Sequence, residues 1–504
     1  MPRYNVVPAL MATQHPDSAT KYFSASEEVE EAVQDLAPLE LNGYGCDEKM
    51  IDYEGKLTPF LQPKWITRRM YELYRERLIP EKDFILTIRA PSADLEAIDR
   101  QLLALLSGIL ANIESERLYN AQVVKYIIHP MTSNVRSLIA VQRRLNKLLN
   151  LAREELGLAR EEDIDVIPLI EDVRIMFNLD AFIHCYRIGL SNMLGLYRDS
   201  LRVLIGKSDA ALAYGHLPSV LGIKVSLWKL HELSEKEGIA IYPILGAGAL
   251  PFRGHLSPLN ASNYVKEYAG YHTVTLQSGF RFDFRKEDVI NAIQILSTHV
   301  GARPNDPGDI DRIRSISRLL TERYLEAILP SMKLISKIAD LMPRRRERLG
   351  RALYGRNLTS VAHFVSNRLR HVLTRTQIVL PRAIRYTAAL YTMGIPPSFI
   401  GTGRGLRDLK SDADLVLDAY PSLRDDLNFD AQFLCLDIAR ECLPPKSFKL
   451  IEEDCTYLFD LFGITAAPLP EYHDVLIEIH KRLSKGLSIE GLVTKTGQIR
   501  GSLG

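Results

Sequence analysis

Six short apolar runs in the first 290 residues end on a polar or charged residue, and this arrangement strongly limits the folds open to the chain. Apolar residues at helical spacing lie between runs, as at 94–116 and 135–157. Strand and helix in alternation predict parallel strands joined by right-handed crossovers. We therefore expect an α/β fold, a (β/α)8-type TIM-like barrel, in which residues at the carboxyl ends of the strands converge on one active site. The residues at the ends of the runs are Arg89, Ser133, Glu171, Asp209, Arg253 and Arg281.

The pattern changes near residue 305, after which the apolar spacing is mostly helical. Helices are predicted at 309–342, 381–394, 413–423 and 473–484. We expect residues 1–300 to form the barrel that carries the active-site motifs. Residues 301–504 should form a large additional, mostly α-helical C-terminal part. Because no low-complexity linker separates the two parts, they should pack as one compact unit.

The charge is nearly balanced, since 63 Lys and Arg against 62 Asp and Glu give a formal net charge of +1 over 504 residues. This balance gives no general attraction to nucleic acid or to a membrane, so neither is expected as a partner. The basic run at 343–348 is accordingly predicted to be a solvated helix face. Five cysteines without a CxxC pair argue against a disulfide framework or a zinc ribbon, and indicate a cytoplasmic location. The chain starts with no secretory signal and contains no run of the roughly 20 apolar residues that a membrane helix needs.

Two carboxylates at run ends suit a divalent cation. Glu171 and Asp209 end different runs, and would approach each other if both runs are barrel strands. Carboxylate oxygens from separate strands, completed by water and substrate, are typical ligands of Mg²⁺ or Mn²⁺. Helix capping is the alternative: Asp172 suits the cap of the helix that follows, and Asp209 could also serve as a cap.

Arginines near the run ends suit an anionic substrate, because the guanidinium fork matches carboxylate and phosphate groups. Arg253 lies in the loop GAGALPFRGH, whose glycines permit close approach of a ligand. Arg89 and Arg281 belong to two other runs. Arg404 lies in a further glycine cluster, for which a turn between helices is the simpler interpretation. For Arg253 the alternative is a tight turn with a solvated arginine, and Arg89 or Arg281 taken alone could form a surface ion pair.

A histidine near the N-terminus adds an acid–base group. His15 lies in TQHPD, where Pro16 restricts it to extended or turn backbone. Imidazole can act as acid, base or hydrogen-bond donor near neutral pH. On spacing alone, the simpler interpretation is a loop histidine with Asp17 as a helix cap. Further along, residues 39–56 predict a strand followed by an ordered loop.

Five motifs taken together resemble a known family: TQHPD, IPLIED, GKSDAALAYG, PFRGH and QSGFRFD occur in this order. They are similar to phosphoenolpyruvate carboxylase in its short, archaeal-type form, and the resemblance runs from residue 10 to the end. DYEGK at 52–56 and GIPPSFIGTGRG at 394–405 look characteristic of the short form. The resemblance implies anaplerotic carbon fixation, in which phosphoenolpyruvate and bicarbonate give oxaloacetate and phosphate through carboxyphosphate and the pyruvate enolate. It also implies Mg²⁺ or Mn²⁺, no biotin, and a homotetramer.

The matching motifs imply a role for individual residues. His15 would handle the carboxyphosphate proton as acid or base, and Glu171 and Asp209 would bind the metal. Arg253 would be catalytic, holding bicarbonate and then carboxyphosphate beside the enolate.

The chain also departs from the longer members of the family. Their lysine three residues after the metal aspartate is Leu212 here, and the first arginine of their glycine-rich loop falls on Ala247. The substrate phosphate must therefore be bound by other cations. The candidate substrate-binding residues are Arg89, Lys207, Arg281 and Arg404.

Two other functions remain open on the sequence. One is another metal-dependent, enolate-forming barrel enzyme, such as a lyase or a pyruvate-kinase-like enzyme, in which His15 would have no obvious role. The other is a non-catalytic helical scaffold protein that keeps an old barrel. Retention of both Glu171 and Asp209 argues against the scaffold.

Overall fold

The structure is a computed structural model that describes residues 7–504 except 17, 25, 162, 345–355, 359 and 377. Asp17 and most of the basic run at 343–348 therefore lie outside the described residues. Among the residues described, no helix combines the length and the apolar character needed to cross a bilayer.

Eight parallel strands close into a barrel, as the sequence predicted, and they follow one another around it in chain order. The barrel closes because the first strand pairs with both the second and the eighth; Leu10, for example, lies opposite Val274. All six predicted runs contain a strand. The first strand was not predicted, since it has only four residues, LMAT, and lacks the Ile and Val that mark the predicted runs. The strands are β1 Leu10–Thr13, β2 Glu48–Asp52, β3 Ile85–Arg89, β4 Val124–His129, β5 Asp165–Ile170, β6 Ser200–Gly206, β7 Ala240–Gly246 and β8 Thr273–Leu276.

Helices cover the outside of the barrel and complete the strand–helix alternation. The helices predicted at 94–116 and 135–157 are α3 and α4, and α4 begins where the Asn134 side chain accepts a hydrogen bond from the Ser137 amide. The helices of this part are α1 Glu27–Leu36, α2 Gln62–Tyr74, α3 Ile98–Tyr119, α4 Val135–Glu155, α5 Val173–Met176, α6 Leu179–Leu194, α7 Lys207–Tyr214, α8 His216–Glu237, α9 Ala261–Glu267, α10 Ser278–Phe282 and α11 Lys286–Thr298, with 3-10 turns η1 Leu39–Leu41, η2 Pro251–Arg253 and η3 Pro258–Asn260.

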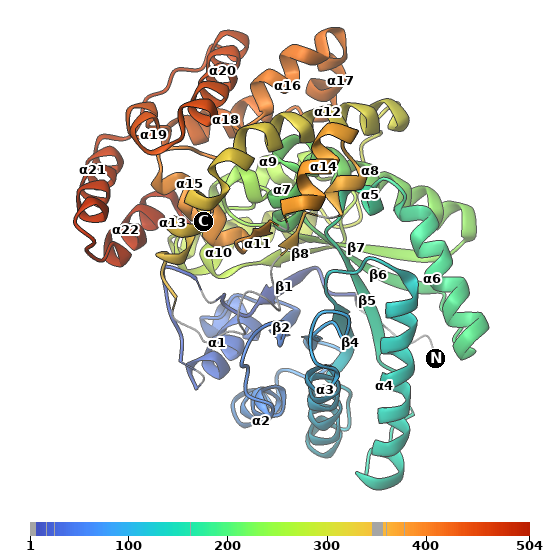
Figure 1. Cartoon of the computed structure of the whole chain (residues 1–504). Helices are drawn as coiled ribbons and strands as arrows, with labels where there is room; N and C mark the ends of the chain where they lie inside the picture. Colours follow the sequence, from blue (N-terminus) through green and yellow to red (C-terminus); the bar gives the residue numbers. More distant parts are fainter. Residues whose placement is uncertain are drawn as a thin grey trace.

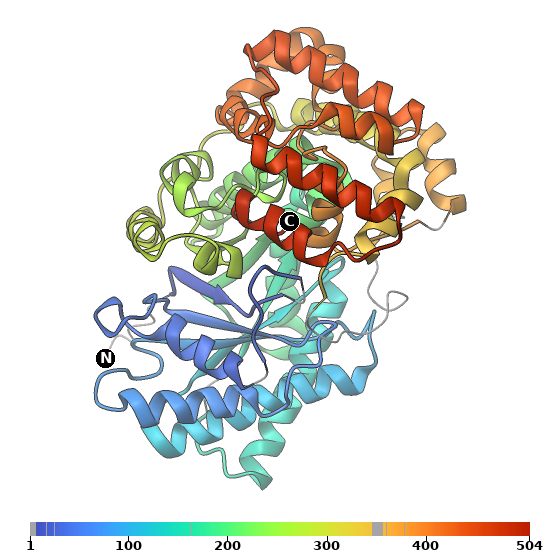
Figure 2. The same ribbon diagram turned by 90° about the vertical axis from the view of Figure 1, so that its left-hand side faces the viewer.

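The rest of the described chain is mostly helical and lies on one side of the barrel, away from α2, α3 and α4 (Figures 1 and 2). The helix predicted at 309–342 is interrupted around Pro330, because proline lacks the amide hydrogen that a continuous helix needs. The helices are α12 Ile310–Ile328, α13 Met332–Asp340, α14 Asn367–Thr376, α15 Ala383–Thr392, α16 Thr402–Leu409, α17 Ala413–Ala419, α18 Leu423–Ala431, α19 Leu436–Cys442, α20 Pro445–Phe462, α21 Pro470–Ser484 and α22 Glu490–Arg500. Two short antiparallel strands, β9 Arg356–Asn357 and β10 Val379–Leu380, pair with each other.

The barrel interior holds a buried ion pair and a separate apolar layer. Arg202 of β6 donates two hydrogen bonds to Glu48 of β2, at 3.0 and 2.8 Å, and both side chains are almost fully buried. Thr87 and Thr273 complete the polar contacts, and the Arg202 guanidinium lies 4.7 Å from the centre of the Tyr126 ring. The apolar layer consists of Met11, Met50, Ile128, Ile167, Leu169, Leu204 and Ile244.

Replacing Arg202 by Met should destabilise the barrel strongly. It leaves the Glu48 carboxylate buried without its cation, which typically costs about 3–5 kcal/mol. The free energy of unfolding in urea measures this loss. Arg285→Met is the control, because Arg285 pairs with Asp288 at the surface and its loss should have no measurable effect. Equal stability of the two variants would contradict a structural role for the Arg202–Glu48 pair.

Candidate active site

A cavity of about 170 Å³ opens at the carboxyl ends of the barrel strands. Strand-end residues form most of its wall, and residues 382–385 at the start of α15 contribute from the helical second half. Four of the predicted site residues line it: Arg89, Glu171, Asp209 and Arg253. The cavity is therefore built where the barrel geometry predicted, and the second half covers part of it.

Glu171 and Asp209 share this cavity because of the local backbone. Glu171 follows β5 directly, and Asp209 lies in the first turn of α7, three residues after β6 ends. Gly206 is the last residue of β6, and a methyl group at this position would lie 2.9 Å from Glu171 Cγ. The absent side chain thus leaves room for the Glu171 side chain beside the end of β6. The helix-capping role next to Glu171 belongs to Asp172, whose side chain accepts a hydrogen bond from the Arg174 amide.

The donor set is compatible with a divalent cation whose remaining ligands come from water and substrate. Glu171 and Asp209 offer hard carboxylate oxygens at one cavity wall. Among the described residues, no group of three or more His, Cys, Asp or Glu lies close enough to hold a metal ion. A metal bound here would therefore take its remaining ligands from water or substrate.

Arg253 is buried, and its guanidinium is fixed on three sides. Its Nε donates to Ser208 Oγ at 3.0 Å, Nη2 donates to Gln277 Oε1 at 2.8 Å, and Nη1 donates to the main-chain oxygen of Gly504. Burial lowers the pKa of Arg253 to about 10, and the charge of Asp209 opposes that shift. At neutral pH the side chain is therefore a fixed cation beside the two carboxylates.

Asp52 and Lys56 also line the cavity, although neither was predicted from the sequence as a site residue. Asp52 lies opposite Arg89 in the register of β2 and β3, and Arg89 Nε donates to it at 2.8 Å. Lys56 Nζ lies 2.6 Å from the same carboxylate, and Arg89 also pairs with Glu54 at 3.1 Å. Burial alone would lower the pKa of Arg89, but the charges of Asp52 and Glu54 raise it. Asp52, Glu54 and Lys56 all belong to the segment DYEGK, which on the sequence alone indicated only the family.

Arg382 is a further missed residue, since the sequence predicted only a helix in its segment. It precedes α15 and brings a cation from the second half to the cavity wall. Its neighbour Arg385 also lines the wall, while its guanidinium donates to the Ala339 carbonyl oxygen at 2.7 Å.

The His15 ring faces α1, although its neighbours Gln14 and Pro16 line the cavity. The ring is fully buried, with Nδ1 3.3 Å from Glu31 Oε2 and 3.8 Å from Glu28 Oε1. His15 is therefore close to the cavity in the chain, but its imidazole contacts the acidic face of a helix.

Arg281 belongs to the same buried group of charges and not to the cavity wall. It pairs with Glu31 at 3.1 Å and with Asp35, and it donates to the Thr13 carbonyl oxygen at 2.5 Å. Lys49 lies 2.6 Å from Asp35. Burial would raise the pKa of Glu31, but Lys49, His15 and Arg281 together hold it well below its usual range. Arg281 thus fixes α1 against β1.

Lys207 and Arg404 are also directed into the protein and away from the cavity. Lys207 Nζ donates to Ser219 Oγ at 2.6 Å and to the Phe252 carbonyl oxygen at 3.1 Å. Burial lowers the pKa of Lys207 to about 7, against the opposing charge of Asp426. Arg404 joins α16 to α20 through two hydrogen bonds to Asp454, at 3.1 and 3.0 Å.

Comparison with known proteins gives one consistent result. A family model described as phosphoenolpyruvate carboxylase matches residues 7–504. The phosphoenolpyruvate carboxylase of Methanosarcina barkeri is 34% identical over 535 aligned residues, which cover 100% of both chains. That of Methanopyrus kandleri is 34% identical and covers 98% of both chains. That of Pyrobaculum islandicum is 36% identical over 90% of this chain and 93% of its own.

Proposed function

The chain belongs to the phosphoenolpyruvate carboxylase family, and we propose that the family's reaction takes place in the cavity at the carboxyl ends of the barrel strands. That reaction converts phosphoenolpyruvate and bicarbonate to oxaloacetate and phosphate. The observation that supports the location is that Glu171, Asp209 and Arg253 line one cavity. Family membership also sets aside the two other functions considered, a different enolate-forming enzyme and a scaffold protein.

Glu171 and Asp209 would hold the divalent metal that the family generally uses, with Mg²⁺ or Mn²⁺ suited to their oxygen ligands. When bound, the metal would supply Lewis-acid stabilisation of negative charge on phosphate and enolate oxygens. No role is proposed for biotin.

Arg253 would hold the bicarbonate and, later, the carboxyphosphate. In the first step a bicarbonate oxygen attacks phosphorus, and the bond between phosphorus and the enol oxygen breaks. Carboxyphosphate and the pyruvate enolate result. Carboxyphosphate then releases phosphate and CO₂, and the enolate carbon bonds to the CO₂ carbon. A buried, fixed guanidinium suits this sequence because it stabilises the anions without reorganising.

We propose a revised set of substrate-binding cations. Arg89 keeps its expected role, and Lys56 and Arg382 join it, because all three line the cavity. Lys207, Arg281 and Arg404 are reassigned to structural roles, because each is held by protein groups away from the cavity wall.

His15 is proposed as the acid–base group that handles the carboxyphosphate proton. Its place between two cavity-lining residues supports this role. In the structure Nδ1 contacts Glu31, so the proton would be handled by Nε2, on the opposite side of the ring.

The remaining proposals concern the whole molecule. All five cysteines are free, which suits a reducing compartment such as the cytoplasm. A homotetramer is proposed from the family resemblance, and light scattering should give the mass of four chains.

Glu171→Gln should abolish metal-dependent turnover, since it removes one of two carboxylate ligands. Loss of a residue that only supports a metal ligand lowers metal affinity by roughly 10- to 100-fold. Loss of the ligand Glu171 should lower Mn²⁺ affinity by at least as much. Mn²⁺ titration and oxaloacetate formation at limiting Mg²⁺ measure the two effects. Asp172→Asn is the matched control: it is the adjacent residue, and asparagine caps a helix as well as aspartate does. Normal activity of Glu171→Gln at limiting Mg²⁺ would remove Glu171 from the metal site.

His15→Asn should keep the fold and the metal affinity but lose roughly 10²- to 10⁴-fold in the rate of oxaloacetate formation, the usual contribution of a general acid–base group. His129→Asn is the control, because His129 is another buried histidine at a strand end and lies outside the cavity wall. Full activity of a folded His15→Asn variant would exclude His15 from proton transfer.

A further inference from the structure

The loop that carries Arg253 has a second face that contacts the helical second half. His255 lies two residues after Arg253 and is 6% exposed. Gly254 between them has a φ of +118°, and His255 itself has a φ of +55°. These two left-handed residues reverse the chain, so that Arg253 and His255 reach different surroundings.

A buried hydrogen bond joins His255 to the second half. Its Nδ1 donates to Oδ1 of Asp426, which lies on α18, and Asp426 is 4% exposed. Oδ2 of Asp426 accepts a hydrogen bond from the Tyr420 hydroxyl, so both carboxylate oxygens are engaged. The Phe429 ring packs against His255 with 4.8 Å between ring centres. This pair is shielded from water, where a charge-assisted hydrogen bond is strong.

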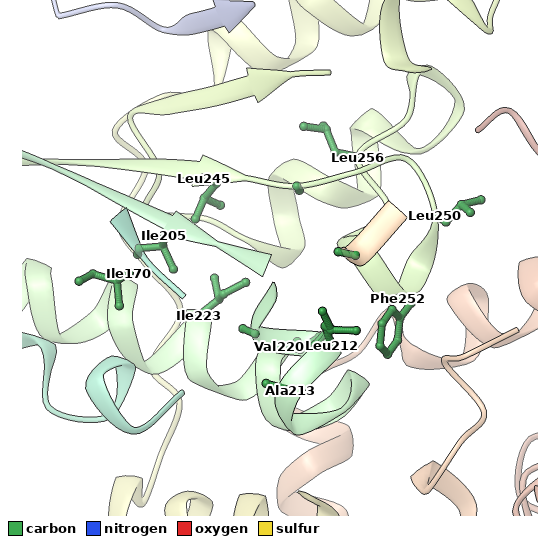
Figure 3. Close-up of a cluster of buried hydrophobic side chains, with 14 of the residues drawn as sticks. Ile170, Ile205, Leu212, Ala213, Val220, Ile223, Leu245, Leu250, Phe252 and Leu256 are labelled. Carbon is green, nitrogen blue, oxygen red and sulfur yellow. The ribbon is translucent and has the colours of Figure 1, made fainter. Parts of the chain in front are cut away.

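The barrel holds the other part of the loop. Phe252, next to Arg253, packs beside Leu212 of α7, and Leu250 belongs to the same apolar cluster (Figure 3). Lys207 Nζ donates to the Phe252 carbonyl oxygen. Arg253 thus lies between an anchor on the barrel and an anchor on α18. Neither His255 nor Asp426 lines the cavity.

We propose that His255 and Asp426 are positioning residues for Arg253: their hydrogen bond fixes the loop after β7 against α18 and thereby sets where the guanidinium points. The inference rests on the role of Arg253 given under Proposed function. Loosening the bond lets the chain turn at Gly254, which has no side chain to restrain it. A displacement of about 1 Å at a group that orients a reactant can lower the rate by roughly 100-fold.

Two substitutions of His255 separate positioning from simple packing. His255→Asn keeps an N–H donor near the position of Nδ1, and asparagine tolerates a positive φ. Aspartate has nearly the same shape as asparagine and also tolerates a positive φ, but in His255→Asp it places a carboxylate against Asp426. We expect His255→Asp to lower kcat/KM for bicarbonate by roughly 10- to 100-fold, and His255→Asn to stay close to the unsubstituted protein.

A double-mutant cycle with Arg253→Lys tests whether the effect passes through Arg253. Lysine keeps the positive charge but lacks the paired N–H donors of the guanidinium group. If His255 acts by positioning Arg253, His255→Asp should cause little further loss in the Arg253→Lys background. Asp426→Asn in the same two backgrounds provides a second comparison if His255→Asp does not fold.

Asp430→Asn is the matched control. Asp430 lies one turn further along α18 and is also buried, but its two carboxylate oxygens accept hydrogen bonds from Tyr391 and Ser398, in other parts of the second half. It should leave kcat/KM for bicarbonate unchanged. The positioning role would be overturned if His255→Asp lowered kcat/KM equally with Arg253 and with Lys at position 253. It would also be overturned if His255→Asn lowered kcat/KM as much as His255→Asp does. Unchanged kcat/KM in Arg253→Lys alone would instead contradict the proposed function of the Arg253 fork.

Discussion

Pairing of β1 with both β2 and β8 closes the barrel, and the arrangement of the site depends on that closure. Because all eight strands are parallel, their carboxyl ends meet at one rim. Closure also brings side chains of opposite strands together inside the barrel, where the Arg202–Glu48 pair and an apolar layer pack, and a cavity opens at the carboxyl ends of the strands. Small features of the rim then decide which side chains reach this cavity. Glu171 reaches it because residue 206 has no side chain.

The helical second half completes the site as well as covering it. Arg382 and Arg385 belong to the cavity wall, and α18 holds the loop that presents Arg253. A further set of charges lies outside the wall: Arg281 and Lys49 offset the buried carboxylates on α1. Charged residues near the rim therefore divide into two groups, one directed into the cavity and one that holds the elements around it in place.

The sequence predicted the barrel and four of its rim residues, because a run of buried strand residues shows where a strand ends. Glu171 lines the cavity because it directly follows β5, and its role as a metal ligand stays a prediction. The direction of a side chain was less predictable than its place in the chain. Lys207 directly follows β6, yet it turns inward to the Phe252 carbonyl oxygen, and Arg281 turns towards α1. No periodicity in the sequence specifies these directions. Asp52 was not predicted as a site residue, because it is held at the cavity by Arg89, and the sequence does not show that the two residues lie opposite each other on neighbouring strands.

The most direct test of the account is a crystal structure of the protein with Mn²⁺ and an unreactive phosphonate analogue of phosphoenolpyruvate. Anomalous scattering locates the manganese independently of the rest of the density. We expect the metal between Glu171 and Asp209, with the analogue in the same cavity and the Arg253 guanidinium beside it. Manganese bound elsewhere, or an analogue outside the cavity at the carboxyl ends of the strands, would contradict the assignment.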